Sequence, residues 1–217
     1  MVTPTTKGGG SFSKSRLEAF SDGVFAIAIT LLVLDIAIGS EGSALDEFLS
    51  GWPSYVGYVI SFITIGVAWI GHSAITEELT KVDAVFLRLN LLLLLFVVFL
   101  PFPTKLVTDA HGNSEMERVS VTVFGFTLLL IRLLNLALDQ YARAEGLYQS
   151  EGTDEELAET RGKTVSGLVL YAVAIVIGLL LPRVAVALYF GIALYLAVPW
   201  RHVVALFRRG SASSPES

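Results

Sequence analysis

The feature that most constrains this chain is a series of apolar stretches, each about as long as a bilayer is thick. Six of them follow one another, at 17–38, 53–75, 84–107, 118–138, 164–181 and 183–206. A helix of about 20 apolar residues spans the hydrocarbon core of a membrane. Only 16% of the 217 residues are charged, against roughly 25% in a soluble domain. The sequence therefore predicts an all-α integral membrane protein with six transmembrane helices.

The two ends of the chain differ from these stretches in composition. Residues 1–15 are rich in Gly, Ser and Thr and predict a flexible cytoplasmic tail. Residues 208–217 predict a second, disordered cytoplasmic tail. A cleaved signal peptide at the N-terminus is disfavoured, because Asp22 interrupts the junction between the basic region and a long apolar core. We therefore expect one six-helix transmembrane domain over 16–207.

Lysine and arginine set the expected orientation in the membrane, because cytoplasmic loops carry an excess of both. If the N-terminus is inside, the inner side holds Lys7, Lys14, Arg16, Lys81, Arg88, Arg143, Arg161, Lys163, Arg201, Arg208 and Arg209. The outer side then holds only Lys105, Arg118 and Arg183. We expect a multi-pass protein of the cell membrane with both termini in the cytoplasm.

Polar residues from three of the predicted helices fall at one depth near the cytoplasmic side. They are Arg16, Ser21 and Asp22 of the first helix, Trp69 and His72 of the second, and Arg88 and Asn90 of the third. Ionisable residues inside a membrane are costly and usually have a partner. Asp22 is too short to reach the headgroups, so its position favours a buried polar cluster with Arg16 and His72 within reach. For Arg88, extension to the lipid headgroups is an equal alternative.

An apolar stripe runs along the first helix, on a different side from this cluster. At about 100° per residue, Ile27, Leu31 and Leu34 fall within an arc of about 60°, and Thr30 borders it. Asp22 lies about 140° away from Ile27 by the same rule. Spacing alone does not separate a pore face from lipid contact or ordinary core packing.

Several classes of function lack the residues they need. The chain has no cysteine, which excludes disulfides and thiolate metal sites, and its three histidines are widely separated. It has no HExxH motif, no P-loop and no Ser/His/Asp set in a soluble loop. We expect no enzyme activity, no metal site, no cofactor and no nucleic-acid partner.

The polar residues also carry a family signature. Arg16 followed by Phe20-Ser21-Asp22, with Trp69 and His72 on the next helix, resembles the transmembrane protein 175 family. Members of that family are potassium-permeable channels, bacterial and lysosomal. The resemblance extends over the six-helix pattern, the short first outer loop and "RLNLLLLLFVVFLPF" on the third helix.

The resemblance implies a homotetramer that conducts potassium ions through a central pore lined by the first helix. Matched by distance from Asp22, Ile27 would be the pore constriction, with Leu31 and Leu34 as further apolar layers and Thr30 implicated in selectivity. Arg16, Ser21, Asp22, Trp69 and His72 would form the interhelical network that braces this helix. The resemblance assigns no role to the last three helices, including Arg132.

No segment of the chain resembles the TVGYG filter, whose carbonyl oxygens replace the water around an ion. Selectivity would then rest on dehydration and pore width at the apolar rings, and we expect it to be modest. Asp35 lies near the outer end of the first helix. In a tetramer, its four copies would form a ring of carboxylates at the pore mouth; the alternative is a solvated acid at a helix end.

A proton-coupled secondary transporter, or a proton leak through the Asp22 and His72 cluster, is the competing hypothesis. Such transporters often have helices broken by Gly or Pro near mid-membrane. Here the prolines fall at predicted helix ends, which favours the channel.

Overall fold

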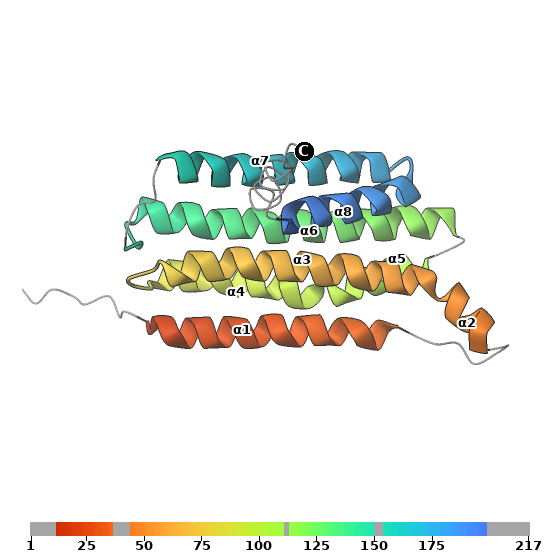
Figure 1. The fold of residues 1–217 in the computed structure, drawn as a ribbon, viewed down its shortest axis with the longest axis horizontal. Coiled ribbons are helices and arrows are strands. Elements are labelled where there is room, and N and C mark those ends of the chain that lie inside the picture. The colour runs from red at the N-terminus through yellow and green to blue at the C-terminus, as the bar shows by residue number, and fades with distance from the viewer. Residues whose placement is uncertain (1–11, 37–43, 111–112, 150–153, 199–217) are drawn as a thin grey trace, which may run out of the picture.

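The computed structural model describes residues 12–36, 44–110, 113–149 and 154–198. The predicted C-terminal tail, and 1–11 of the predicted N-terminal tail, lie outside the described residues. The elements are α1 (Lys14–Leu31), η1 (Leu32–Asp35), α2 (Ala44–Ser50), α3 (Trp52–Glu77), α4 (Ala84–Phe99), α5 (Pro101–Asp109), α6 (Ser114–Ala144), α7 (Asp154–Gly178) and α8 (Pro182–Ala197). Figure 1 shows the long helices side by side along one axis, with α1 at one edge of the bundle and α7 at the opposite edge.

These helices account for the six apolar stretches. Four segments are long and apolar enough to cross a membrane: Lys14–Leu34, Trp52–Glu77, Ala84–Asp109 and Ser114–Ala144. Two shorter apolar helices, Val165–Gly178 and Pro182–Ala197, follow them. The described residues contain isolated β-bridges but no strand. The predicted all-α membrane fold is confirmed, with six helical segments in the predicted order.

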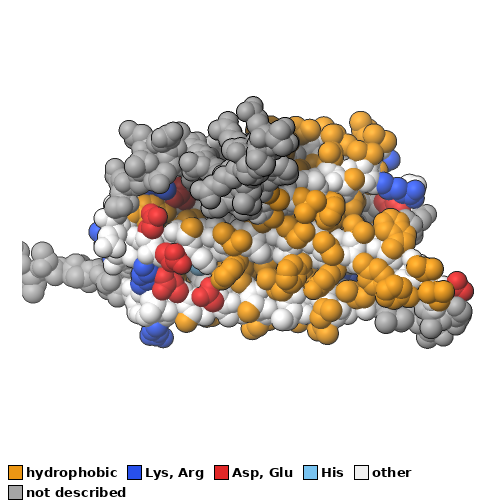
Figure 2. Space-filling model, viewed as in Figure 1, with side chains coloured by type: hydrophobic (Ala, Val, Ile, Leu, Met, Phe, Trp, Pro, Cys, Tyr) orange, Lys and Arg blue, Asp and Glu red, His pale blue; other side chains and the backbone are white. Residues whose placement is uncertain are grey.

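The bundle has two ends, which we name by the residues that begin α1 and α3. At the Lys14 end, α1 and α4 begin and α3 and α6 finish; at the Trp52 end, α3, α6 and α8 begin. On the face seen in Figure 2, charged side chains gather toward these ends and apolar side chains cover the middle. This distribution suits a bundle whose middle lies in hydrocarbon.

Pro101 interrupts the third membrane span rather than ending it. α4 finishes at Phe99 and α5 begins at Pro101, yet the two helices together form the single span Ala84–Asp109. Proline lacks an N–H and is favoured at the first position of a helix. The expectation that the prolines lie only at the ends of the spans therefore needs this correction.

α6 occupies the centre of the bundle, where it packs against α3, α4, α5, α7 and α8. It approaches α8 closely at Gly125, where a Cβ atom would collide with the buried ring and hydroxyl of Tyr189. The Tyr189 hydroxyl donates to the Val121 carbonyl, 3.3 Å away. Glycine at position 125 is therefore required by the close contact between these two helices.

Hydrogen bonds close the loops at the Lys14 end. The Asp83 carboxylate accepts from the amides of Val85 and Phe86, which caps α4, and from the Tyr141 hydroxyl of α6 at 2.7 Å. Desolvation raises the pKa of Asp83, but the hydrogen bonds from Phe86, Tyr141 and Val85 outweigh it, so the pKa lies below its ordinary value. The loop between α3 and α4 is therefore joined to α6 by a charged side chain.

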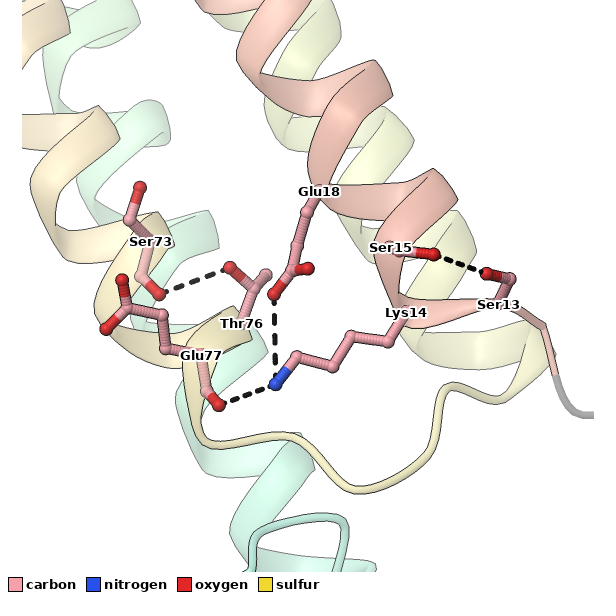
Figure 3. A network of polar contacts seen from close by, with 7 residues as sticks. All are labelled: Ser13, Lys14, Ser15, Glu18, Ser73, Thr76 and Glu77. Carbon is pink, nitrogen blue, oxygen red and sulfur yellow. Dashed lines mark hydrogen bonds and ion pairs between the residues drawn. The ribbon is translucent and has the colours of Figure 1, made fainter.

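Figure 3 shows a second contact at this end, between the start of α1 and the end of α3. The Lys14 ammonium donates to the Glu77 carbonyl oxygen at 2.6 Å and lies 3.8 Å from the Glu18 carboxylate. The last carbonyls of a helix lack partners within it and carry partial negative charge, so a lysine stabilises them. Lys14 thereby adds a polar connection between α1 and α3 to the apolar packing between these two helices.

Candidate pore helix and its polar contacts

α1 presents two different faces. Toward α3 and α4 it buries Phe25, which is 1% exposed, together with Leu17 and Ala28, and Leu32 of η1 is buried as well. The apolar stripe points the other way: Ile27 is 58%, Leu31 39% and Leu34 75% exposed. Within the described residues, the helix is therefore packed mainly on one side.

Thr30 lies on the exposed side, and its polar group already has a partner. Its hydroxyl donates to the Ile27 carbonyl oxygen of the preceding turn, 2.8 Å away. This back-bonding is the usual way for threonine to satisfy its hydroxyl within a helix. The stripe thus carries a hydroxyl oxygen that can still accept hydrogen bonds.

On the packed side, a buried chain of hydrogen bonds joins three helices. The Asn90 amide of α4 donates to the Ser21 hydroxyl of α1 at 3.0 Å, and its carbonyl oxygen lies 2.7 Å from His72 Nε2 of α3. Because that oxygen can only accept, Nε2 must carry the proton. All three side chains are fully or almost fully buried. Asn90 is therefore the bridge that connects α1, α3 and α4.

A second contact joins α1 to α3 nearer the surface. The indole N–H of Trp69 donates to the Asp22 carboxylate at 2.9 Å, and both side chains are exposed. Tryptophan can only donate here and an ionised carboxylate can only accept, so the pair is well matched. Four of the five predicted network residues, Ser21, Asp22, Trp69 and His72, thus make contacts between helices.

The remaining sequence-predicted residues are placed differently. Arg16 is exposed and, within the described part of the chain, makes no hydrogen bond or ion pair with Asp22 or His72. Arg88 is also exposed, where it can extend toward headgroups. The backbone of Asp35 closes η1, but its side chain lies outside the described part of the structure.

Sequence reasoning placed Asn90 in the polar layer but did not identify it as the residue at its centre. An amide two residues after a charged side chain, Arg88, in the first half of a leucine-rich helix was the available signal. An amide carries its donor and its acceptor on two separate atoms, and neither depends on pH. This is what allows one side chain to connect a hydroxyl to an imidazole.

Arg132 and Asn135 of α6 border a second polar region, between α3, α7 and α8. They line a cavity of about 20 Å³ together with Thr64 and Tyr171. The Asn135 Oδ1 atom is buried there without a hydrogen-bond partner among the described residues. The space is close to what one water molecule needs. Arg132 therefore faces a small polar space inside the bundle.

Comparison with known proteins gives consistent results. A family model described as "Endosomal/lysosomal potassium channel TMEM175" matches residues 16–101. A potassium channel of Chamaesiphon minutus is 34% identical over 189 residues, which are 84% of this chain and 93% of that protein. The solved structure of a lysosomal potassium-selective channel TMEM175 homolog from the same organism has a TM-score of 0.76 at 33% identity, covering 85% of this chain and 96% of that one.

A vertebrate relative matches a shorter part of this chain. The chicken endosomal/lysosomal proton channel TMEM175 is 37% identical over 123 residues, which are 51% of this chain but only 25% of that protein. This chain therefore spans about a quarter of the vertebrate relative. The relatives are named as ion channels, which agrees with the prediction that the chain is not an enzyme.

Proposed function

We infer that this chain, which belongs to the TMEM175 family of potassium channels, is itself a potassium-selective channel whose pore is lined by α1. Four copies would surround the pore, and each would contribute the exposed stripe of Ile27, Leu31 and Leu34. The protein would be placed in the cell membrane with both termini in the cytoplasm, since the loops expected there carry most of the Lys and Arg.

One observation carries this proposal: the helix with the family signature leaves its apolar stripe uncovered by its own subunit. Other helices also expose apolar side chains, for example Leu95, so exposure alone does not assign a pore. α1 adds two properties. It lies at the edge of the bundle, where other copies can approach it, and its opposite face is fixed by polar contacts to α3 and α4.

The stripe would act as gate and selectivity constriction at once. Rings of Ile27, Leu31 and Leu34 offer an ion no ligands, so a narrow ring loses its water and blocks conduction. When the rings widen, potassium would pass more readily than sodium because it is easier to dehydrate. Thr30, which borders the rings, would supply the nearest hydroxyl oxygen.

The polar contacts would keep the pore helix in place while the rings change width. Ser21, Asn90 and His72 fix the inner half of α1 against α3 and α4, and Asp22 with Trp69 adds a second connection. Arg16, although part of the signature, would act outside a single subunit, since it is exposed there. Asp35 is proposed as a ring of carboxylates that concentrates cations at the outer mouth.

The test is the current through purified protein in planar bilayers. With potassium on one side and sodium on the other, we expect a reversal potential displaced from zero toward potassium selectivity. Replacing Ile27 by Asn should raise conductance and reduce the displacement, because an amide keeps the ring wet. Ala26→Asn is the matched control, since Ala26 is exposed but about 100° round the helix.

Two results would contradict the proposal. Absence of current from folded wild-type protein would show that the chain does not form a channel. Equal conductance and reversal potential for Ile27→Asn and Ala26→Asn would show that α1 does not line the pore, even if the wild type conducts.

A second candidate is proton conduction, favoured by the proton channel name of the chicken relative. His72, the buried titratable residue of the polar contacts, is the residue to test. Proton flux into vesicles free of potassium, lost in His72→Gln, would support a leak through the channel. Saturable flux that requires a second ion would instead indicate a transporter.

A further inference from the structure

We propose that the cavity at the Trp52 end of the bundle is a phospholipid site, which holds an acyl chain between the helices and the phosphate at Arg183. The cavity has a volume of about 840 Å³ and lies between α3, α5, α6 and α8. It is separate from the face of α1 proposed as the pore. Volumes of about 300–1,000 Å³ are typical of sites for small organic ligands.

The shape of the cavity suits a chain-like ligand. Its walls run from Trp52 to Ile60 along α3 and from Pro182 to Phe190 along α8. At about 1.5 Å per residue, each wall is about 12 Å deep, measured from the helix ends toward mid-membrane. The cavity therefore follows the direction in which lipid chains enter a bilayer.

The chemistry of the walls selects an apolar occupant. Most of the lining is Val, Ile, Phe, Pro and Ala, and the deepest positions include Ile60, Phe124 and Phe190. Val59 and Phe190 belong to the lining and are also exposed on the bundle surface, so the cavity is reached from the side. Water gains little in such a space, whereas hydrocarbon from the surrounding membrane fills it at no loss of hydrogen bonds.

The mouth of the cavity carries the group that recognises a phosphate. Arg183, at the start of α8, donates to the Glu117 carboxylate at 3.2 Å. Glu117 is 11% exposed by side chain, but Arg183 is 74% exposed. The buried carboxylate therefore holds one edge of the guanidinium while donors remain on the outer side. A guanidinium binds phosphate in a two-pronged manner that an ammonium does not match.

Trp52 completes the amphiphilic arrangement. It begins α3 at the same end, lines the cavity and is exposed. Tryptophan is enriched where a membrane protein meets the headgroup layer, because its ring is apolar and its N–H is polar. The order found from the helix ends inward, cation with indole and then hydrocarbon wall, is the order of groups in a phospholipid.

The experiment measures lipid binding to the purified, full-length protein by native mass spectrometry, without any measurement of current. The probes are phosphatidylglycerol and diacylglycerol with the same acyl chains. We expect the wild type to bind the phospholipid, and Arg183→Gln to weaken that binding about tenfold while leaving diacylglycerol unchanged. Lys105→Gln is the matched control, because Lys105 is a cation at the same end that does not line the cavity.

A second measurement locates the bound acyl chain and needs no substitution that fills the cavity. In a variant that retains Trp52 as its only tryptophan, a phospholipid brominated along its acyl chain should quench the fluorescence more strongly than one brominated in the headgroup. Arg183→Gln should weaken the quenching and Lys105→Gln should not.

The proposal is overturned if Arg183→Gln and Lys105→Gln bind phospholipid equally, or if the brominated chain does not quench Trp52. It is also overturned if wild-type protein retains no lipid because a second copy of the chain covers the cavity, which crosslinking from Ala187 would reveal. Each of these results leaves the proposed pore untouched, so failure of the lipid site and failure of the channel are distinguishable.

Discussion

α1 and α6 are both long apolar helices, yet the bundle uses them in opposite ways. In the most apolar window of α6, 50% of the residues are buried within the described chain, against 28% for α1. Among the described residues, α6 packs against five helices, α3, α4, α5, α7 and α8, whereas α1 packs mainly against α3 and α4. More of α6 than of α1 is therefore constrained by packing within the described chain, and the exposed side of α1 is not.

The two helices also differ in where their polar side chains lie and what these side chains contact. α1 places Ser21 on its buried side and Asp22 nearer the surface, and each has a partner on another helix. α6 places Arg132 and Asn135 at a small internal cavity. Paired polar groups fix the orientation of a helix because any rotation would leave them unsatisfied inside the membrane. In α1 such pairs act in addition to the apolar contact with α3 and α4.

Glycine to alanine substitutions should show the largest difference between the two helices. In Gly125→Ala the new methyl group would collide with the Tyr189 ring, whose Cζ would lie 2.6 Å away. Overpacking at so rigid a site should lower the free energy of unfolding by about 3 kcal/mol. In Gly23→Ala the methyl group would meet no atom within 4 Å, and stability should be unchanged or higher by up to about 1 kcal/mol.

Thermal unfolding of both variants in detergent, followed by size-exclusion chromatography, measures this difference. Equal stability of the two variants would show that the contact between α6 and α8 is not rigid. Loss of assembly in Gly23→Ala alone would indicate that the exposed side of α1 is packed in the oligomer.

Removing the central amide of the polar chain should have the next largest effect. Asn90→Leu leaves the Ser21 hydroxyl and the His72 ring N–H without their partner, at a cost of about 2 kcal/mol. A double-mutant cycle with Ser21→Ala separates the hydrogen bond from general packing. We expect a coupling energy of about 1 kcal/mol, measured from chemical unfolding. Additive effects would mean that the two side chains do not stabilise each other.

The Asp83 contact should have a smaller, pH-dependent effect. Asp83→Ala removes the cap of α4 and the partner of Tyr141, and should cost about 1 kcal/mol at neutral pH. Because the pKa of Asp83 is lower in the folded protein, its contribution is present above the unfolded pKa of about 4 and is lost as pH falls through the folded value.

Unfolding measured from pH 7 down to pH 3 should therefore show wild type and Asp83→Ala converging in acid. Asn113→Ala is the control, since Asn113 caps α6 with an amide that does not titrate. A difference for Asp83→Ala that stays constant over this range would show that the cap acts without its charge.

The sequence was sufficient to predict which residues share a depth in the membrane. Bilayer thickness sets helix length, and antiparallel helices then bring Ser21, His72 and Asn90 to one layer. It was not sufficient to predict their partners. The expected neighbour of Asp22 was Arg16 or His72, whereas the contact is with Trp69. Partners depend on how each helix is rotated about its axis, which packing sets and spacing does not.

The cavity at the Trp52 end was beyond sequence reasoning for a related reason. Arg183 was placed only on the outer side, at the start of the last apolar stretch, and Glu117 was not singled out. Their ion pair joins positions 66 residues apart, and the space beneath it depends on four helices. The break at Pro101, which begins α5, contributes one of these walls. Such a space depends on the angles between helices, and the apolar periodicity of a single helix does not predict those angles.

The smallest predicted effect concerns the polar connection of α1 at its first turn. Lys14→Met removes the hydrogen bond to the Glu77 carbonyl and the ion pair with Glu18, and should cost about 0.5 kcal/mol. Because the contact is partly exposed, the loss should shrink further between 0.05 and 0.5 M salt, by about half. Lys81→Met, at the same end of the bundle, is the control. A larger loss for Lys14→Met in channel assembly than in monomer unfolding would mean that the first turn of α1 acts between subunits, which would sharpen the contrast with α6.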